Sequence, residues 1–385
     1  MGACSGIEKP DLTIQAPIFE RAVTKEENGV RVSASVLGNE EARRVFGIDL
    51  ARKDIQALWI KVENDVDRPI VLLPTAIDPE YFSPFEVSFA YHEFLADDAN
   101  EALDTHLLKL NFPIRSLIQP GTAASGYIFT NWTNRNKVVD VDLIGDDFSR
   151  NFTFFIPNPD SEIARNIVER LETELSDSER QNIQREADLR RALEQLPCCV
   201  SKEIGGPPAE PLNVVMIGAL DDWTTAFMRR GYRYEVLNPR YAFGHAQDIS
   251  GRKLNPKYTE AQAHTFRVWR TPIRYRGKPV WVGQTGLRLG GRFRENAPEE
   301  VTLPLDPYID ETRYNFVQDL AYSQALTKIG HVKGGGRSQS TRTEGEAGNV
   351  HYKTDGLRAV LVFGDRPSSL ASIDFFDWER LADYR

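Results

Sequence analysis

The sequence predicts a multidomain protein with an N-terminal all-β sandwich of immunoglobulin-like type, a helical connector and a C-terminal mixed α/β (α+β) domain. The chain has 385 residues, whereas an ordinary domain has about 150. Short segments rich in β-branched and aromatic residues fill its first part, which is typical of a sandwich. A charged helical stretch follows, and strands then alternate with helices after residue 212.

The sandwich is expected over residues 18–158. Leu58, Ile60 and Val62 alternate with polar or aromatic neighbours, as in a half-buried strand. An insert at 95–110 is expected to form a short helix. The expected strands lie within 28–37, 55–65, 69–74, 85–92, 126–133, 137–145 and 151–157.

The helical connector is expected over residues 159–197. Its first helix would begin behind Asp160 and Ser161 and bury an apolar residue at every fourth position. Its second would begin at Ser176, with Glu179 completing a capping box. The apolar positions are Ile163, Ile167, Leu171 and Leu175 in the first helix, and Ile183, Ala187, Leu189 and Leu193 in the second.

The C-terminal domain is expected over residues 207–364, with a tail at 365–385. An apolar strand at 212–218 precedes a helix in which Trp223 and Phe227 lie one turn apart and Gly231 ends the helix. Two long strands at 264–289 turn at Arg276-Gly277, and a helix at 305–324 is expected to be capped by Asp306. The last strands lie at 325–332, 350–353 and 357–364, and the tail docks by Phe375, Phe376 and Trp378 or stays loose.

A series of phrases in this half resembles a known family. In order they are "PLNVVMIG", "YAFGHAQDIS", "HTFRVWR", "VWVGQTG", "DPYIDETR" and "HYKTDGLRAVLVF", and they resemble the LssY C-terminal domain family. The resemblance implies a bacterial domain without an established activity, sometimes fused to membrane domains of the DedA type and to type 2 phosphatidic-acid phosphatases. It implies a link to the cell envelope and carries over no phosphatase activity. The chain departs from the family's pattern at His245, where Arg is usual, and at Ala263, where His is frequent.

The polar residues that could carry chemistry form one candidate set. Histidines and carboxylates suit a metal site or an acid/base pair, and arginine suits a phosphate or carboxylate. The set has no HExxH, HxH or clustered Asp triplet, however. On a strand, His264 would share a face with Phe266 while Arg267 points the other way. The set is His245, Asp248, His264, Arg267, Asp306, Asp310 and Arg313.

Two functional hypotheses follow. The first is a non-catalytic binding or assembly module of the cell envelope. It is favoured because Asp306 is explained as a helix cap, and Asp310 with Arg313 as an i,i+3 ion pair. The second is a hydrolase acting on phosphate esters or lipids, with His264, Asp248 and Arg267 as its catalytic residues. We expect no cofactor and no metal ion.

The net charge restricts the classes of partner that we expect, and the cysteine count restricts the expected disulfide bonds. A net charge of −9 argues against nucleic acid, whose binding requires clustered Lys and Arg. Three cysteines are too few for a disulfide framework. Cys198 and Cys199 could be free thiols, pair elsewhere, or bridge through a strained small ring.

The first residues suggest a location. Gly2-Ala3-Cys4-Ser5 resembles the end of a bacterial lipoprotein signal, whose cysteine is lipidated. The sequence lacks the basic and apolar segments that precede such a cysteine, so either the start is assigned too late, the chain is truncated, or the motif is a chance one at a cytosolic terminus. We expect lipidation at Cys4, a tether over residues 1–17, and a periplasmic or outer-membrane lipoprotein with an envelope protein or lipid partner.

Overall fold

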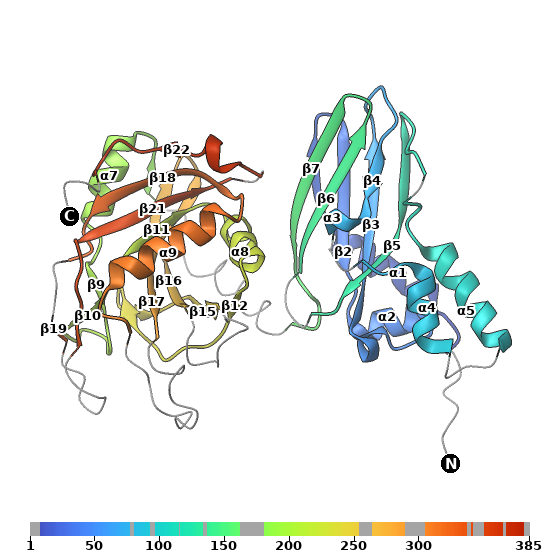
Figure 1. Cartoon of the computed structure of the whole chain (residues 1–385), viewed down its shortest axis with the longest axis horizontal. Coiled ribbons are helices and arrows are strands. Elements are labelled where there is room, and N and C mark those ends of the chain that lie inside the picture. Colours follow the sequence, from blue (N-terminus) through green and yellow to red (C-terminus); the bar gives the residue numbers. More distant parts are fainter. Residues whose placement is uncertain are drawn as a thin grey trace, which may run out of the picture. The chain divides into compact units, whose positions relative to one another are not determined.

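The multidomain prediction is confirmed by two units, residues 1–168 and 169–385 (Figure 1). Each unit has its own sheets and its own buried core. The computed structural model describes residues 8–77, 81–92, 97–114, 116–133, 137–161, 181–253, 264–288, 305–336, 340–341, 350–364 and 367–380.

Two antiparallel sheets form a sandwich in the N-terminal unit. Leu58, Ile60 and Val62 face the shared core as predicted, and Val139 and Val141 meet them from the other sheet. The first sheet has the order β1-β2-β3-β5, from β1 (Val23–Glu27), β2 (Val30–Val36), β3 (Ile55–Asn64) and β5 (Thr122–Asn131). The second has the order β4-β6-β7, from β4 (Val71–Leu73), β6 (Lys137–Gly145) and β7 (Phe148–Ile156).

The strand order differs from that of a constant-type immunoglobulin domain. With the strands lettered A to G in chain order, the sheets here are A-B-C-E and D-F-G. The immunoglobulin constant domain has A-B-E-D and C-F-G. The N-terminal unit is therefore a two-sheet sandwich whose strand order differs from that of the immunoglobulin constant domain.

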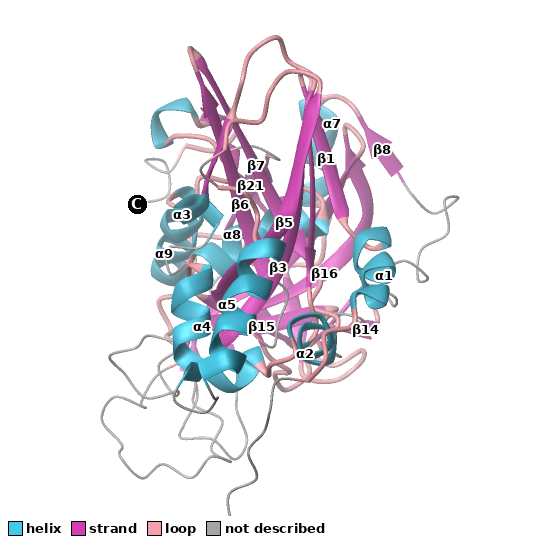
Figure 2. Cartoon of the chain, turned by 90° about the vertical axis from the view of Figure 1, so that its right-hand side faces the viewer, coloured by secondary structure: helices cyan, strands magenta, loops and turns pink. Residues whose placement is uncertain are grey.

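Helices cover the outer face of the first sheet and form a second core. Trp59 of β3 and Tyr127 of β5 are buried there against Phe46 and Leu107 of the helices. Helices α4 and α5 lie side by side in this layer (Figure 2). The helices of the unit are α1 (Gln15–Glu20), α2 (Asn39–Phe46), α3 (Pro74–Ile77), α4 (Pro84–His92) and α5 (Asp97–Leu110), with 3-10 turns η1 (Leu12–Ile14) and η2 (Leu50–Lys53).

One expected strand of this unit is a helix. Residues 85–92 lie in α4, because Ser83 and Glu86 form a reciprocal cap in which the Ser83 N–H donates to Glu86 (2.7 Å) and the Glu86 N–H donates to Ser83 (3.2 Å). Val87 and Tyr91, four residues apart, then face the core together. The helix expected at 95–110 is confirmed as α5.

The connector is described only in its second half. The first expected helix lies mostly in residues 162–180, outside the described residues. The second helix begins later than expected, as α7 (Glu186–Glu194), with Leu189 and Leu193 buried. Residues 181–183 form strand β8 (Gln181–Ile183) instead, because their backbone pairs with the edge of strand β16 (His264–Tyr275).

A nine-stranded mixed sheet organises the C-terminal unit. The hairpin predicted at 264–289 is confirmed: Arg276 and Gly277 have φ of +49° and +82°, and Gly277 supplies the left-handed conformation that the turn requires. The order is β12-β15-β16-β17-β11-β21-β18-β22, with β8 on β16. Its further strands are β11 (Val214–Ile217), β12 (Tyr232–Tyr234), β15 (Ile249–Lys253), β17 (Lys278–Leu287), β18 (Leu326–Lys333), β21 (Leu357–Phe363) and β22 (Asp374–Phe375).

Each face of this sheet is covered by a different layer. Helices α8 (Leu220–Arg229) and α9 (Ile309–Ala321) cover one face, where Phe227 lies 4.8 Å from Phe266 and 5.4 Å from Phe316 between ring centroids. Helix α7 packs on the other face, with Trp269 in its core. The tail docks there through Phe376 and Trp378, whereas Phe375 is exposed.

A small sheet joins this second layer. It has the order β10-β9-β13-β14, from β9 (Cys199–Ser201), β10 (Pro208–Pro211), β13 (Tyr241–Ala242) and β14 (His245–Ala246). The remaining elements are β19 (Ser340–Thr341), β20 (Val350–His351) and η4 (Leu370–Ser372). Within the parts of the chain that the structure describes, no helix is long and apolar enough to cross a bilayer.

Candidate functional site

Strand β16 separates two of the predicted catalytic residues. His264 shares its face with Phe266, beneath α8 and α9, and Arg267 lies on the opposite face with Trp269, as alternation predicts. Three residues of strand also place them about 10 Å apart along the chain. The two side chains therefore belong to different layers of the domain.

His264 lies beside an ion-pair network on α9. Asp319 of that helix accepts hydrogen bonds from Arg230 (3.2 Å), Tyr232 (3.2 Å) and Lys253. Burial lowers the pKa of His264, although the Asp319 carboxylate opposes this. Its buried Nδ1 atom has no hydrogen-bond partner among the described residues. His264 is thus a neutral side chain next to carboxylates and cations that already satisfy one another.

Asp248 is used by the backbone of the sheet. Its Oδ2 atom accepts the N–H of Arg270 at 2.6 Å, and its own N–H donates to Val268 at 2.9 Å. His245 lies 3.6 Å from the second carboxylate oxygen and is exposed. Asp248 therefore extends the pairing of β15 with β16, which accounts for its burial.

Arg267 lies in a group that we call the arginine cluster. Its guanidinium donates to Gln284 of β17 (2.9 Å) and to the carbonyl of Asn238 (3.3 and 3.4 Å). The arginine cluster consists of Arg240, Arg252, Arg267 and Arg288. Because side chains alternate along β15, β16 and β17, Arg252, Arg267 and Arg288 share one face of the sheet, and Arg240 reaches this face from the covering layer.

Two carboxylates neutralise half of the arginine cluster. Glu210 of β10 accepts bidentate hydrogen bonds from Arg240 at 3.0–3.1 Å, and Glu235 pairs with Arg252. Burial lowers the pKa of Arg267 to about 10, and the neighbouring Arg240 adds to this effect. Burial and then Arg252 lower the pKa of Arg288. Glu210 and Glu235 thus pair with Arg240 and Arg252, whereas Arg267 and Arg288 have no carboxylate partner among the described residues.

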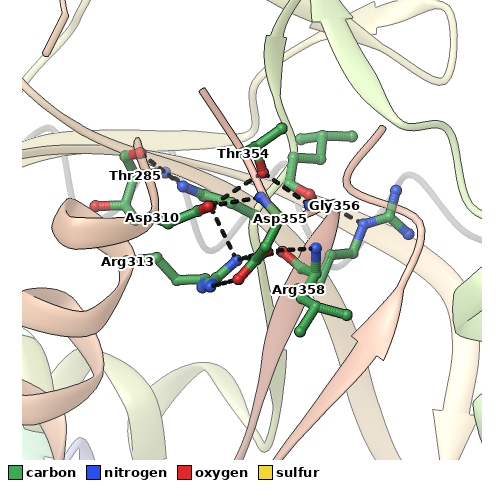
Figure 3. Close-up of polar contacts among 10 residues, drawn as sticks. Thr285, Asp310, Arg313, Thr354, Asp355, Gly356 and Arg358 are labelled. Atoms are coloured by element: carbon green, nitrogen blue, oxygen red, sulfur yellow. Dashed lines mark hydrogen bonds and ion pairs between the residues drawn. The ribbon is translucent and has the colours of Figure 1, made fainter. Parts of the chain in front are cut away.

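A second buried arginine forms the network of Figure 3. Arg313 of α9 is fully buried and donates to both carboxylate oxygens of Asp355 (2.9 and 2.7 Å), to Asp310 (3.1 Å) and to the carbonyl of Leu357 (2.6 Å). Asp310 in turn accepts the Asp355 N–H (2.6 Å) and the Thr354 hydroxyl (3.0 Å). The i,i+3 ion pair expected for Asp310 and Arg313 is confirmed, within a network that fixes α9 to the turn before β21.

The helix cap expected at Asp306 is wrong in position. Helix α9 begins at Ile309 with Tyr308 as its N-cap, and Asp306 accepts the Tyr308 N–H at 2.9 Å, one turn earlier. The Asp306 N–H donates to the Leu287 carbonyl. This bond keeps Asp306 paired with the sheet, so the helix begins three residues later, at Ile309.

Arg358 of β21 binds backbone carbonyls instead of carboxylates. It is fully buried and donates to the carbonyls of Leu193, Leu196, Pro197, Leu212 and Gly334. Burial lowers its pKa to about 10. These contacts hold the segment before Cys198 and Cys199, which form a disulfide bond with each other, so the bridged alternative is the observed one.

Metal ligands do not gather in the described part of the chain: no group of three or more His, Cys, Asp or Glu side chains there could hold an ion. The expected lipidation residue, Cys4, lies outside the described residues.

The C-terminal unit is thus a three-layer mixed α/β domain, and among its described residues the buried arginines Arg267, Arg313 and Arg358 are hydrogen-bonded in three different ways. Residues 233–357 match the family model described as LssY C-terminus, so the family expected for this region is confirmed there. A comparison with curated proteins finds no match. The matched region contains every member of the arginine cluster and both acidic partners of Arg313, but not Glu210 or Arg358.

Sequence reasoning missed Glu210, Arg240, Gln284 and Asp355. Glu210 and Arg240 meet because β9 lies between β10 and β13 in the small sheet, a pairing that local pattern does not encode. The turn at Arg276-Gly277 alone would place Gly286 opposite Arg267, and an irregularity between Arg270 and Arg274 shifts the register so that Gln284 lies there, which local pattern does not encode either.

Proposed function

We propose that the chain is a non-catalytic binding or assembly module. The observation that supports the proposal is that His264, Asp248 and Arg267 are divided between two faces of one sheet, with Asp248 engaged by the backbone. A hydrolase requires its acid, base and anion-binding groups within hydrogen-bond reach of one substrate. The polar groups here hold elements together, which suits a rigid module that binds a ligand.

Incubation of the purified chain with phosphate mono- and diesters, with and without divalent metal ions, tests this proposal. We expect no turnover above a heat-denatured control. Turnover that is lost in both His264→Gln and Asp248→Asn would overturn the proposal in favour of the hydrolase. The His106→Gln variant is the matched control, since His106 belongs to the N-terminal unit, bonds the Val45 carbonyl (2.8 Å) and lies outside the candidate set.

We also propose a cell-envelope location with an N-terminal lipid anchor at Cys4 and an envelope protein or lipid as partner. The support is the Gly2-Ala3-Cys4-Ser5 motif and the envelope link that the family resemblance implies. Mass spectrometry of the N-terminus from native membranes would detect a lipidated cysteine, and Cys4→Ser would release the protein into the soluble fraction. An unlipidated Met1 in the native protein contradicts the anchor.

A further inference from the structure

Two members of the arginine cluster, Arg267 and Arg288, have no ion-pair partner in the part of the chain that the structure describes. Glu210 is nearly fully buried and both of its oxygens accept from Arg240, and Glu235 pairs with Arg252. Neither carboxylate is hydrogen-bonded to Arg267 or Arg288 in the described part of the chain. A buried guanidinium without a carboxylate is costly, because desolvation is not offset by an opposite charge.

Arg267 has hydrogen-bonding capacity left over. A guanidinium has five N–H donors, and Arg267 is 4% exposed with three bonds, two of them long ones to one carbonyl. Arg288 follows the last residue of β17 and lies on the same face of the sheet as Gln284 and Arg267. It is half-buried, and its side chain makes no hydrogen bond or ion pair within the described ranges. Both arginines therefore keep unused donors on one face of the sheet, where the charge of Arg288, four residues beyond Gln284, acts on Arg267.

Gln284 adds an independent observation. Its side chain is fully buried, and its Oε1 atom accepts from Arg267. Its Nε2 atom has no hydrogen-bond partner among the described residues. An unmatched buried donor is destabilising, so the position is explained if an acceptor from outside the chain occupies it.

We propose that Arg267, Arg288 and Gln284 form a binding site for a doubly charged phosphate group, either free or as a monoester. Arg267 and Arg288, which have no carboxylate partner among the described residues, supply two positive charges that match this charge, and the planar guanidinium fork matches phosphate oxygens. The half-buried Arg288 admits the group and the buried Arg267 and Gln284 fix its inner oxygens. This inference deepens the proposed binding function and rests on it.

Titration calorimetry of the full chain with inorganic phosphate, in a phosphate-free buffer, tests the site. Arg288→Gln and Arg267→Gln are expected to weaken binding by about 10- to 100-fold, since each removes a charge-assisted hydrogen bond. Arg274→Gln is the matched control, because Arg274 lies on β16 like Arg267, and its side chain donates to the carbonyl of Gly277 in the exposed turn (2.8 Å). Arg288 is half-buried, so its variant keeps the test valid if Arg267→Gln does not fold.

Two further arms distinguish the sources of the phosphate. Glycerol 3-phosphate is titrated in the same way, and phosphatidylcholine vesicles with and without phosphatidic acid are used in a flotation assay. Binding to the acidic vesicles that Arg288→Gln abolishes supports a lipid phosphate at this site. No binding in any arm, or equal binding by Arg288→Gln and Arg274→Gln, overturns the inference. Hydrolysis of the monoester would instead overturn the non-catalytic function, so the two failures differ.

Discussion

Arg313 and Arg267 are both buried arginines of the C-terminal unit, but their charges are balanced differently. Arg313 pairs with two carboxylates, Asp310 of its own helix and Asp355 of a neighbouring turn. Arg267 meets an amide and a carbonyl, with Arg240 and Arg288 nearby. Arg313 is balanced by its own counter-ions, and Arg358 by five backbone carbonyls. Arg267 has neither, which is why we propose it, and not the other two, as a residue that binds an anion from outside.

The largest effect is expected from Asp355→Asn. The change removes the bidentate partner of a fully buried guanidinium, so the free energy of unfolding should fall by about 3–5 kcal/mol. Urea unfolding measures it, with Asp377→Asn as control because the Asp377 side chain is 92% exposed. A loss below about 1 kcal/mol would show that Asp310 alone balances Arg313 and would break the contrast.

The pH dependence of stability should be the next largest effect. His331 of β18 lies near Arg313, and burial first and then the Arg313 charge lower its pKa to about 4. Because the unfolded histidine titrates near 6.5, the unfolded state binds more protons between these values, and stability falls as the pH falls from about 6.5 to 4.

Asp355, the acidic partner of Arg313, adds to this loss of stability at lower pH. Burial raises the pKa of Asp355, but hydrogen bonds from Arg313 outweigh it and the pKa ends below its usual value. Its stabilising contribution is thus present above the unfolded pKa and is lost as the pH falls through the folded pKa. His331→Gln should remove up to about 3 kcal/mol of the loss between pH 7 and 4, measured by urea unfolding. An unchanged pH profile in this variant would place the titration elsewhere.

Parts of this arrangement follow from the sequence. The turn at Arg276-Gly277 fixed the hairpin, and alternation along β16 placed His264 and Arg267 on opposite faces. The strand expected at 85–92 is wrong, since its apolar residues suit both a strand and a helix, and the local signal for the helix is the Ser83–Glu86 cap. The pairing of Arg313 with Asp355 could not be predicted, because 42 residues separate them and only the parallel placement of β21 beside β11 brings that turn to α9.

The smallest effect on stability is expected from Arg288→Gln, and it is the sharpest test of the contrast. This change removes a cation that lies near Arg252 and Arg240 and leaves no described carboxylate without a partner, so stability should change by no more than about 0.5 kcal/mol. Arg240→Gln is the opposite case, because it leaves Glu210 buried without its ion pair, and should cost about 3 kcal/mol or more. Both are measured by urea unfolding without phosphate.

Saturating phosphate should then raise the stability of the wild type but not that of Arg288→Gln, because only a native state that binds the ion gains free energy from it. An Arg288→Gln protein as destabilised as Arg240→Gln would mean that Arg288, like Arg313, serves the fold alone.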